Sequence, residues 1–165
     1  MKQLPTFLMD NITHVVLLFI ICAGILLLLL HDWNTTRRKA KHAKPIYCHD
    51  FLERWDLFRK NDKPGCYIIL IYKRRPSSRK IRKLKGFDEV YIGQSINMHK
   101  RVYNHFTGHG NGDVYADVKY KRFVYVKFVP CKTEQLNSYE KQLIDTFDAT
   151  TSYNRTKGGA KLTQR

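Results

Sequence analysis

Hydrophobic residues follow two different patterns along this chain. From Ile12 to Leu30 the sequence contains no charged residue, and residues 15–30 carry no strongly polar side chain. A stretch of this length matches the roughly 20 residues that a helix needs to cross the hydrocarbon core of a bilayer. Farther along, apolar residues come in short runs with the spacing of strands and amphipathic helices. The pattern predicts one N-terminal transmembrane helix followed by a separate folded domain.

The domain combines strand patterns with helix patterns. Three runs rich in β-branched and aromatic residues predict strands at Gly65–Lys73, Glu89–Gly93 and Arg122–Val129. Helical spacing is found over Ile96–Phe106 and over residues 133–147, where Thr133 is the expected N-cap. The predicted fold class is α/β (α+β), with a small three-stranded sheet, antiparallel or mixed, flanked by helices.

The segment between the apolar run and the first strand is basic and then amphipathic. Residues 34–44 predict a solvated tether, of the kind that attracts anionic headgroups beside a bilayer. Residues 49–60 place Phe51, Trp55 and Phe58 at helical spacing. We expect a short helix there, packed on the domain core or lying on the membrane. The predicted parts are an anchor (1–33), the tether and short helix (34–63) and the domain (64–165).

The charge of the chain points to a polyanionic partner. It carries 30 Lys and Arg against 14 Asp and Glu, a formal charge of +16, which suits nucleic acid or anionic lipid. More basic residues follow the apolar run than precede it, so the positive-inside rule predicts a single-pass protein of the inner (cytoplasmic) membrane. Residues 12–30 would contact lipid, and the domain would face the cytoplasm. The alternative is a cleaved signal peptide, but its positive charge would precede the apolar run.

The cysteines exclude two classes of small domain. Cys22, Cys48, Cys66 and Cys131 form no C-x-x-C pair, and Cys22 lies inside the apolar run. A zinc finger or a disulfide framework would need paired spacings. The thiols therefore agree with a reducing cytoplasm.

Two tyrosines are expected to share one face of the sheet. Because side chains alternate along a strand, Tyr67 lies with Ile69 and Ile71, and Tyr91 lies with Gly93. If the first two strands pair, both hydroxyls emerge on one side, beside a glycine that leaves room for close approach.

Further polar residues follow these strands in the sequence. Arg101 and His105 are four residues apart and therefore lie on one helix face. Glu140 lies beside an apolar stripe, and Asn154 precedes a Gly-rich tail. Taken singly, each has an ordinary structural explanation, but their order is informative.

This order resembles the GIY-YIG nuclease family over roughly residues 64–160. The first motif is Gly65-Cys66-Tyr67, with cysteine in place of isoleucine, and the second is Tyr91-Ile92-Gly93. The arginine, histidine, glutamate and asparagine that follow these motifs in members of the family match, in order, Arg101, His105, Glu140 and Asn154.

The resemblance implies hydrolysis of phosphodiester bonds by one metal ion. Glu140 would hold a single Mg²⁺ or Mn²⁺, because one carboxylate argues against a two-metal site. Tyr67 would be the general base, and Arg101 would meet the phosphate with its planar fork. By the same resemblance, Tyr91 and His105 would orient the water or assist the proton transfer, and Asn154 would fix the arrangement by hydrogen bonding. Gly65 and Gly93 would have structural roles in the two strands.

The segment between the two motifs is the most basic part of the chain. Seven of the fourteen residues from Arg74 to Phe87 are basic. They suit a phosphate clamp beside the active site, or alternatively a mobile hairpin loop kept soluble by its charge. The candidate DNA-binding residues are Arg74, Arg75, Arg79, Lys80, Arg82, Lys83 and Lys85.

These observations together predict a membrane-anchored, metal-dependent endonuclease that acts on double-stranded DNA. Cutting phage or other foreign DNA at the inner membrane is the expected role, and DNA uptake or repair is an alternative. A catalytically idle module that tethers DNA to the membrane is a further alternative. Neither the cleavage specificity nor the oligomeric state is indicated by the sequence.

Overall fold

The computed structural model describes residues 6–154, and the side chains of residues 14–154. The chain divides into two compact units between Thr35 and Thr36. In the first unit, helix α1 (Thr6–His42) carries the long apolar run with its side chains exposed. Among the described residues, one helix, over His14–His42, is long and apolar enough to cross a membrane.

The second unit is built on a four-stranded antiparallel sheet in the order β1-β4-β2-β3. The prediction of three strands was wrong, because β1 is a two-residue strand on β4 and is too short to show alternation. The remaining elements in chain order are β1 (Ile46–Tyr47), α2 (Cys48–Glu53), α3 (Trp55–Lys60), β2 (Gly65–Tyr72), α4 (Ser78–Lys83), β3 (Glu89–Ser95), α5 (Met98–Phe106), α6 (Gly112–Lys119), β4 (Phe123–Pro130), η1 (Thr133–Gln135), α7 (Leu136–Phe147) and η2 (Ala149–Thr151).

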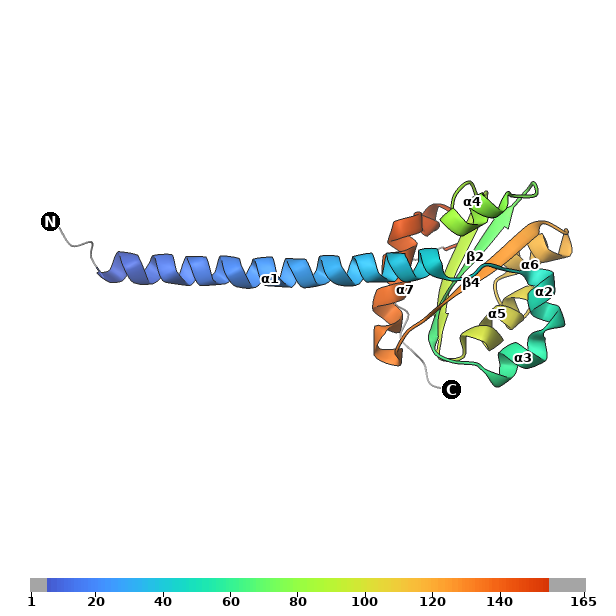
Figure 1. Cartoon of the computed structure of the whole chain (residues 1–165), viewed down its shortest axis with the longest axis horizontal. Helices are drawn as coiled ribbons and strands as arrows, with labels where there is room; N and C mark the ends of the chain where they lie inside the picture. The colour runs from blue at the N-terminus through green and yellow to red at the C-terminus, as the bar shows by residue number, and fades with distance from the viewer. Residues whose placement is uncertain (1–5, 155–165) are drawn as a thin grey trace. The chain divides into compact units, whose positions relative to one another are not determined.

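Strand β2 lies at the centre of the domain and is buried along its whole length. Its even-numbered residues, such as Ile68 and Leu70, pack against α4 and α7. Its odd-numbered residues, such as Ile69 and Ile71, pack against α2, α5 and α6. Helices therefore cover both faces of the sheet (Figure 1), which explains why β2 is a continuous apolar run rather than an alternating one.

The predicted solvated tether is instead helical. Helix α1 continues to His42, and within the second unit Thr36 and Ala40 are fully buried. Lys39 donates from Nζ to the hydroxyl of Tyr139 on α7, at 3.1 Å. The last turns of α1 form part of the domain core, because small side chains there allow close packing against the sheet.

Residues 49–60 pack on the domain core, as the first of the two alternatives predicted. They form two short helices, α2 and α3, rather than one. Phe51 is 0% exposed, and its ring contacts the rings of Phe58, Phe106 and Phe128 at centroid distances of 4.7–5.8 Å.

The basic insert is folded. Ser77 caps the short helix α4 by accepting from the Lys80 N–H, and Leu84 ends the helix in the left-handed conformation. Ile81 and Leu84 are buried on the α7 side of the sheet. Lys127, a fully buried lysine on β4, also holds the insert in place. Its Nζ donates to the carbonyl oxygens of Lys41 and Arg82.

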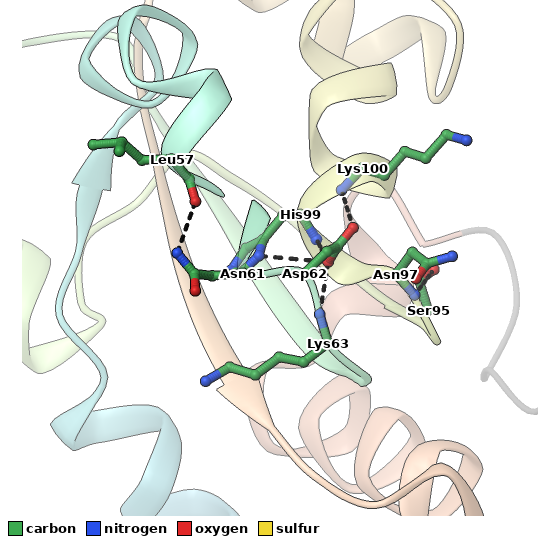
Figure 2. Close-up of polar contacts among 8 residues, drawn as sticks. All are labelled: Leu57, Asn61, Asp62, Lys63, Ser95, Asn97, His99 and Lys100. Atoms are coloured by element: carbon green, nitrogen blue, oxygen red, sulfur yellow. Dashed lines mark hydrogen bonds and ion pairs between the residues drawn. The ribbon is translucent and has the colours of Figure 1, made fainter. Parts of the chain in front are cut away.

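The start of helix α5 is capped by a residue from another segment (Figure 2). Asp62 Oδ1 accepts from the His99 N–H at 2.9 Å, and Oδ2 accepts from the Lys100 N–H at 3.0 Å. Asn97, at the N-cap position, makes no side-chain capping bond. The negative charge of Asp62 also interacts favourably with the positive N-terminal end of the helix dipole. Asp62 therefore fixes the helix that carries Arg101 and His105.

Candidate active site

The strand register places the two motif tyrosines on one face of the sheet, as predicted. Tyr67 pairs with Gly93, and Tyr91 pairs with Ile69. A Cβ atom on Gly93 would clash with the hydroxyl end of the Tyr67 ring. The space left by this glycine is therefore filled by Tyr67 itself. The close approach expected there is made by a side chain of the protein.

Tyr67 and His105 form a buried hydrogen-bonded pair. The Tyr67 hydroxyl lies 2.9 Å from His105 Nε2, and both side chains are at most 1% exposed. The Asn111 N–H donates to His105 Nδ1 at 2.7 Å. Since Nδ1 accepts, the neutral ring carries its proton on Nε2 and donates that proton to the Tyr67 oxygen. Gly110 leaves the space that the imidazole occupies.

The charges around this pair oppose the effects of burial. Burial raises the pKa of Tyr67 well above its ordinary value of 10, and it also raises the pKa of Tyr91. The Arg101 guanidinium acts on both hydroxyls in the opposite direction and offsets part of this rise in their pKa values. Burial, assisted by the same guanidinium, lowers the pKa of His105 to about 3. His105 therefore stays neutral at physiological pH, while Arg101 is the cation that favours a phenolate.

Glu140 approaches this site from the opposite face of the sheet, on helix α7. Its side chain is 9% exposed, and Oε2 accepts from Gln94 Nε2 at 2.9 Å. Gln94 Nε2 also donates to Asn137 Oδ1 at 2.6 Å. Gln94 Oε1 is buried and has no hydrogen-bond partner within the part of the chain that the structure describes. Burial of an unpaired acceptor beside a carboxylate is unfavourable unless a cation or donor joins them.

The donor set at Glu140 fits one magnesium ion. Carboxylate and amide oxygens are the hard ligands that Mg²⁺ prefers, and this ion keeps several waters when few protein ligands are present. No group of three or more His, Cys, Asp or Glu side chains suitable for a metal occurs among the described residues. A site with several acidic ligands is therefore not formed by this part of the chain.

Asn154 is bound to the edge strand of the sheet. Its Oδ1 accepts from the Ile92 N–H at 2.8 Å, and its Nδ2 donates to the Ile92 carbonyl at 2.6 Å. This pair of bonds holds β3 between Tyr91 and Gly93. Asn154 thus contacts the site through the backbone of Ile92, which lies between Tyr91 and Gly93.

Comparison with protein families gives a match over most of the second unit. A model described as the GIY-YIG catalytic domain matches residues 63–154. The chain belongs to the GIY-YIG family. Comparisons with curated proteins and with solved structures found no match. The resemblance drawn from the two motifs is therefore confirmed, and the family is one of nuclease type.

The packing of Cys66 explains how cysteine can replace the isoleucine of the first GIY-YIG motif. This residue is 0% exposed and faces α7, on the opposite side of the sheet from Tyr67. Its thiol lies 3.6 Å from the Leu136 carbonyl oxygen. Cysteine thus fills the isoleucine position of the motif as a small core residue.

The structure brings Tyr67, Tyr91, Arg101 and His105 together, with Glu140 next to them. It does not bring the basic insert to the same place, because the insert follows the other end of β2. Lys73 is six residues from Tyr67, or about 20 Å along an extended strand. The expectation of a clamp beside the active site does not agree with this arrangement, although the insert remains a candidate for binding DNA elsewhere.

Three residues of the GIY-YIG site were missed from the sequence. Gln94 could have been found, because alternation after Gly93 places it on the face that carries Glu140. Gly110 and Asn111 follow the helix predicted over Ile96–Phe106 and were given no role from the sequence. Asn111 in fact begins α6 as its N-cap, and the same residue donates to His105. No sequence signal connects them to the histidine.

Proposed function

We propose that this protein is a membrane-anchored, metal-dependent endonuclease that hydrolyses phosphodiester bonds in double-stranded DNA. Membership of the GIY-YIG family supports a nuclease-type function. The observation that carries the proposal is the buried Tyr67–His105 pair facing the Arg101 cation. A module that only binds DNA would gain nothing from burying a phenol with a neutral imidazole donor.

The residues of the site have separable roles in this reaction. Tyr67 acts as the general base in its phenolate form, which the His105 N–H and the Arg101 guanidinium stabilise. Taking a proton from the attacking water returns Tyr67 to the neutral phenol. Tyr91 orients the water at the same face. Arg101 also contacts the phosphate, whose negative charge grows in the transition state.

Glu140 and Gln94 are the residues that would hold the magnesium or manganese ion. When bound, the ion neutralises charge on the scissile phosphate. Gln94 positions Glu140 through the hydrogen bond that it donates. Asn154 and Gly93 keep β3 in the register that places Tyr91 beside Tyr67.

The test is cleavage of supercoiled plasmid by the full-length chain in a neutral detergent. We expect nicked and linear products with Mg²⁺ or Mn²⁺ and none with EDTA. The Glu140→Gln variant should bind plasmid and leave it intact. Glu134→Gln is the matched control, since this exposed glutamate lies two turns earlier in the same segment. Plasmid cleavage by Glu140→Gln at the rate of the control would overturn the proposed metal ligand.

Three exposed basic residues of helix α4, Arg79, Arg82 and Lys83, are proposed to contact the DNA backbone away from the scissile phosphate. Anchoring restricts the DNA that the enzyme meets, so we propose that it cuts incoming phage or foreign DNA at the inner membrane. The apolar helix supports anchoring. In cells, the protein should fractionate with the inner membrane, and its C-terminus should resist external protease. Recovery of the C-terminus outside the cell would contradict this topology.

A further inference from the structure

A second polar site lies at the end of the β2–β3 hairpin that is remote from Tyr67. A cavity of about 410 Å³ opens there, lined by the end of β2, the start of α4 and the turn before β3. Its basic lining residues are Lys73, Arg74, Arg75 and Lys80. In the part of the chain that the structure describes, none of these four cations lies in a salt bridge. Four unpaired cations around one hollow repel each other, and an anion would relieve this repulsion.

Tyr72, one of the residues that line the cavity, has a buried hydroxyl without a partner among the described residues. Tyr72 is 2% exposed, and its hydroxyl makes no hydrogen bond to any described residue. Leaving such a group without a hydrogen-bond partner is unfavourable. Burial raises the pKa of Tyr72 to about 12, so the hydroxyl keeps its proton and can donate.

Side-chain contacts to the backbone at Gly86 and Lys73 fix part of the cavity lining. Gly86 adopts a φ of 64°, and a Cβ there would lie 3.6 Å from Cδ of Lys80, so the lysine stem runs across the glycine. The only acidic lining residue is Asp88, whose Oδ2 accepts from the Lys73 N–H at 2.7 Å. The cations therefore outnumber the acid within a fixed frame.

We propose that this cavity binds the phosphate group of a phosphate monoester. A monoester carries close to two negative charges at neutral pH, whereas a backbone diester carries one. Four cations and one carboxylate match the dianion better. A terminal phosphate can also enter a concave site, whereas a diester is flanked on both sides. The inference does not depend on the proposed nuclease activity.

Small probes test the chemistry directly. Methyl phosphate represents a monoester, and dimethyl phosphate represents the diester of a nucleic-acid backbone. Their binding to the full-length chain in neutral detergent would be measured by calorimetry with EDTA present. We expect methyl phosphate to bind at least tenfold more tightly. Equal binding of the two probes, or no binding of either, would overturn the proposal.

Variants locate the site. Arg74→Gln with Lys80→Gln should weaken methyl phosphate binding at least tenfold, and Tyr72→Phe should weaken it severalfold. The matched control is Arg59→Gln with Lys119→Gln, which removes the same charge from exposed residues that do not line the cavity. The near-ultraviolet circular dichroism of each variant reports whether it is folded. If the control loses as much affinity as the cavity variant, binding is a general charge effect and the proposal fails.

Competition identifies what bears the phosphate. Short duplexes with 5′-phosphate or 5′-hydroxyl ends would compete with methyl phosphate for the detergent-solubilised chain. In reconstituted bilayers, phosphatidic acid would be compared with phosphatidylglycerol. Stronger competition by the 5′-phosphorylated duplex or by phosphatidic acid supports the proposal and names the source. Equal competition within both pairs would show that the cavity accepts diesters, and would overturn it.

Discussion

Strand β2 carries two buried tyrosines, five residues apart, in contrasting surroundings. Tyr67 is 1% exposed and its hydroxyl is hydrogen-bonded to a neutral histidine, with one arginine cation acting on it. Tyr72 is 2% exposed and lies on the opposite face. Among residues 14–154, its hydroxyl has no hydrogen-bond partner, and the four cations that line the same cavity form no salt bridge. The first phenol is held by the protein before any ligand arrives. The second has no partner among the described residues, and the proposed phosphate would supply one.

This difference separates chemistry from binding. A group that must change its protonation during a reaction needs preorganised neighbours, because reorganisation would raise the barrier. A site that only recognises an anion can leave donors and cations unpaired until the anion binds. Substitutions around Tyr67 should therefore change turnover and folding. Substitutions around Tyr72 should change the affinity for the bound anion.

The largest effects should follow loss of charge at the Tyr67 end. Arg101→Ala should lower the cleavage rate about 10²–10³-fold, because it removes charge stabilisation of the transition state. Glu140→Gln should also stop cleavage, through loss of metal occupancy. Raising Mg²⁺ or substituting Mn²⁺ should restore part of the activity of Glu140→Gln and none of that of Arg101→Ala. If metal restores both variants equally in a plasmid assay, the two roles are not distinct.

The buried histidine should make stability depend on pH. Burial, with the nearby Arg101 cation, lowers the pKa of His105 to about 3 in the folded chain, against about 6.5 when unfolded. The unfolded state therefore binds the extra proton first, and stability falls as pH falls from 6.5 towards 3. The slope is about 1.4 kcal/mol per pH unit for one proton.

Denaturant titrations across this pH range would measure the slope. In the variant His105→Gln, the slope of the unfolding free energy against pH should fall by the contribution of about one proton. The variant His109→Gln, at an exposed histidine in the same region, should keep it. A slope unchanged in His105→Gln would show that another group is responsible.

The edge-strand clamp should contribute to folding. Asn154→Ala removes both bonds to Ile92 and should lower the free energy of unfolding by about 2 kcal/mol. Cleavage should also decrease, because Tyr91 and Gly93 flank Ile92. Asn97→Ala, at an exposed asparagine without a capping bond, is the control for thermal denaturation. Equal stability of the two variants would remove Asn154 from the positioning of β3.

The smallest effect should come from the insert. Arg79, Arg82 and Lys83 would be replaced together by Gln. The slope of log DNA affinity against log salt concentration should then become shallower by about 0.9 for each lost phosphate contact. Turnover at saturating DNA should be nearly unchanged. The control replaces three exposed lysines on other helices, Lys60, Lys119 and Lys141. If the control reduces the salt slope as much, the insert has no special part in binding DNA.

Much of this arrangement could be predicted from the sequence, because strand alternation and helix spacing are local signals. They placed both tyrosines on one face and located the helix that carries Arg101. They could not reveal β1, which has two residues, or helix α6, which follows a Gly-rich segment. Helix α4 was also missed, because five of its six residues are polar or basic and only Ile81 marks its buried side. The partners of His105 depend on how a loop folds back, and no periodicity encodes that.

The buried lysine on β4 has a consequence for how this chain tolerates mutation. Among the described residues, Lys127 is the one Lys or Arg that is buried. Its ammonium group joins two carbonyl oxygens, at the ends of α1 and α4. A survey that replaced each basic residue in turn should find most positions neutral for folding and this one intolerant. Methionine there would strand two acceptors, and arginine would need space that the packed face does not offer.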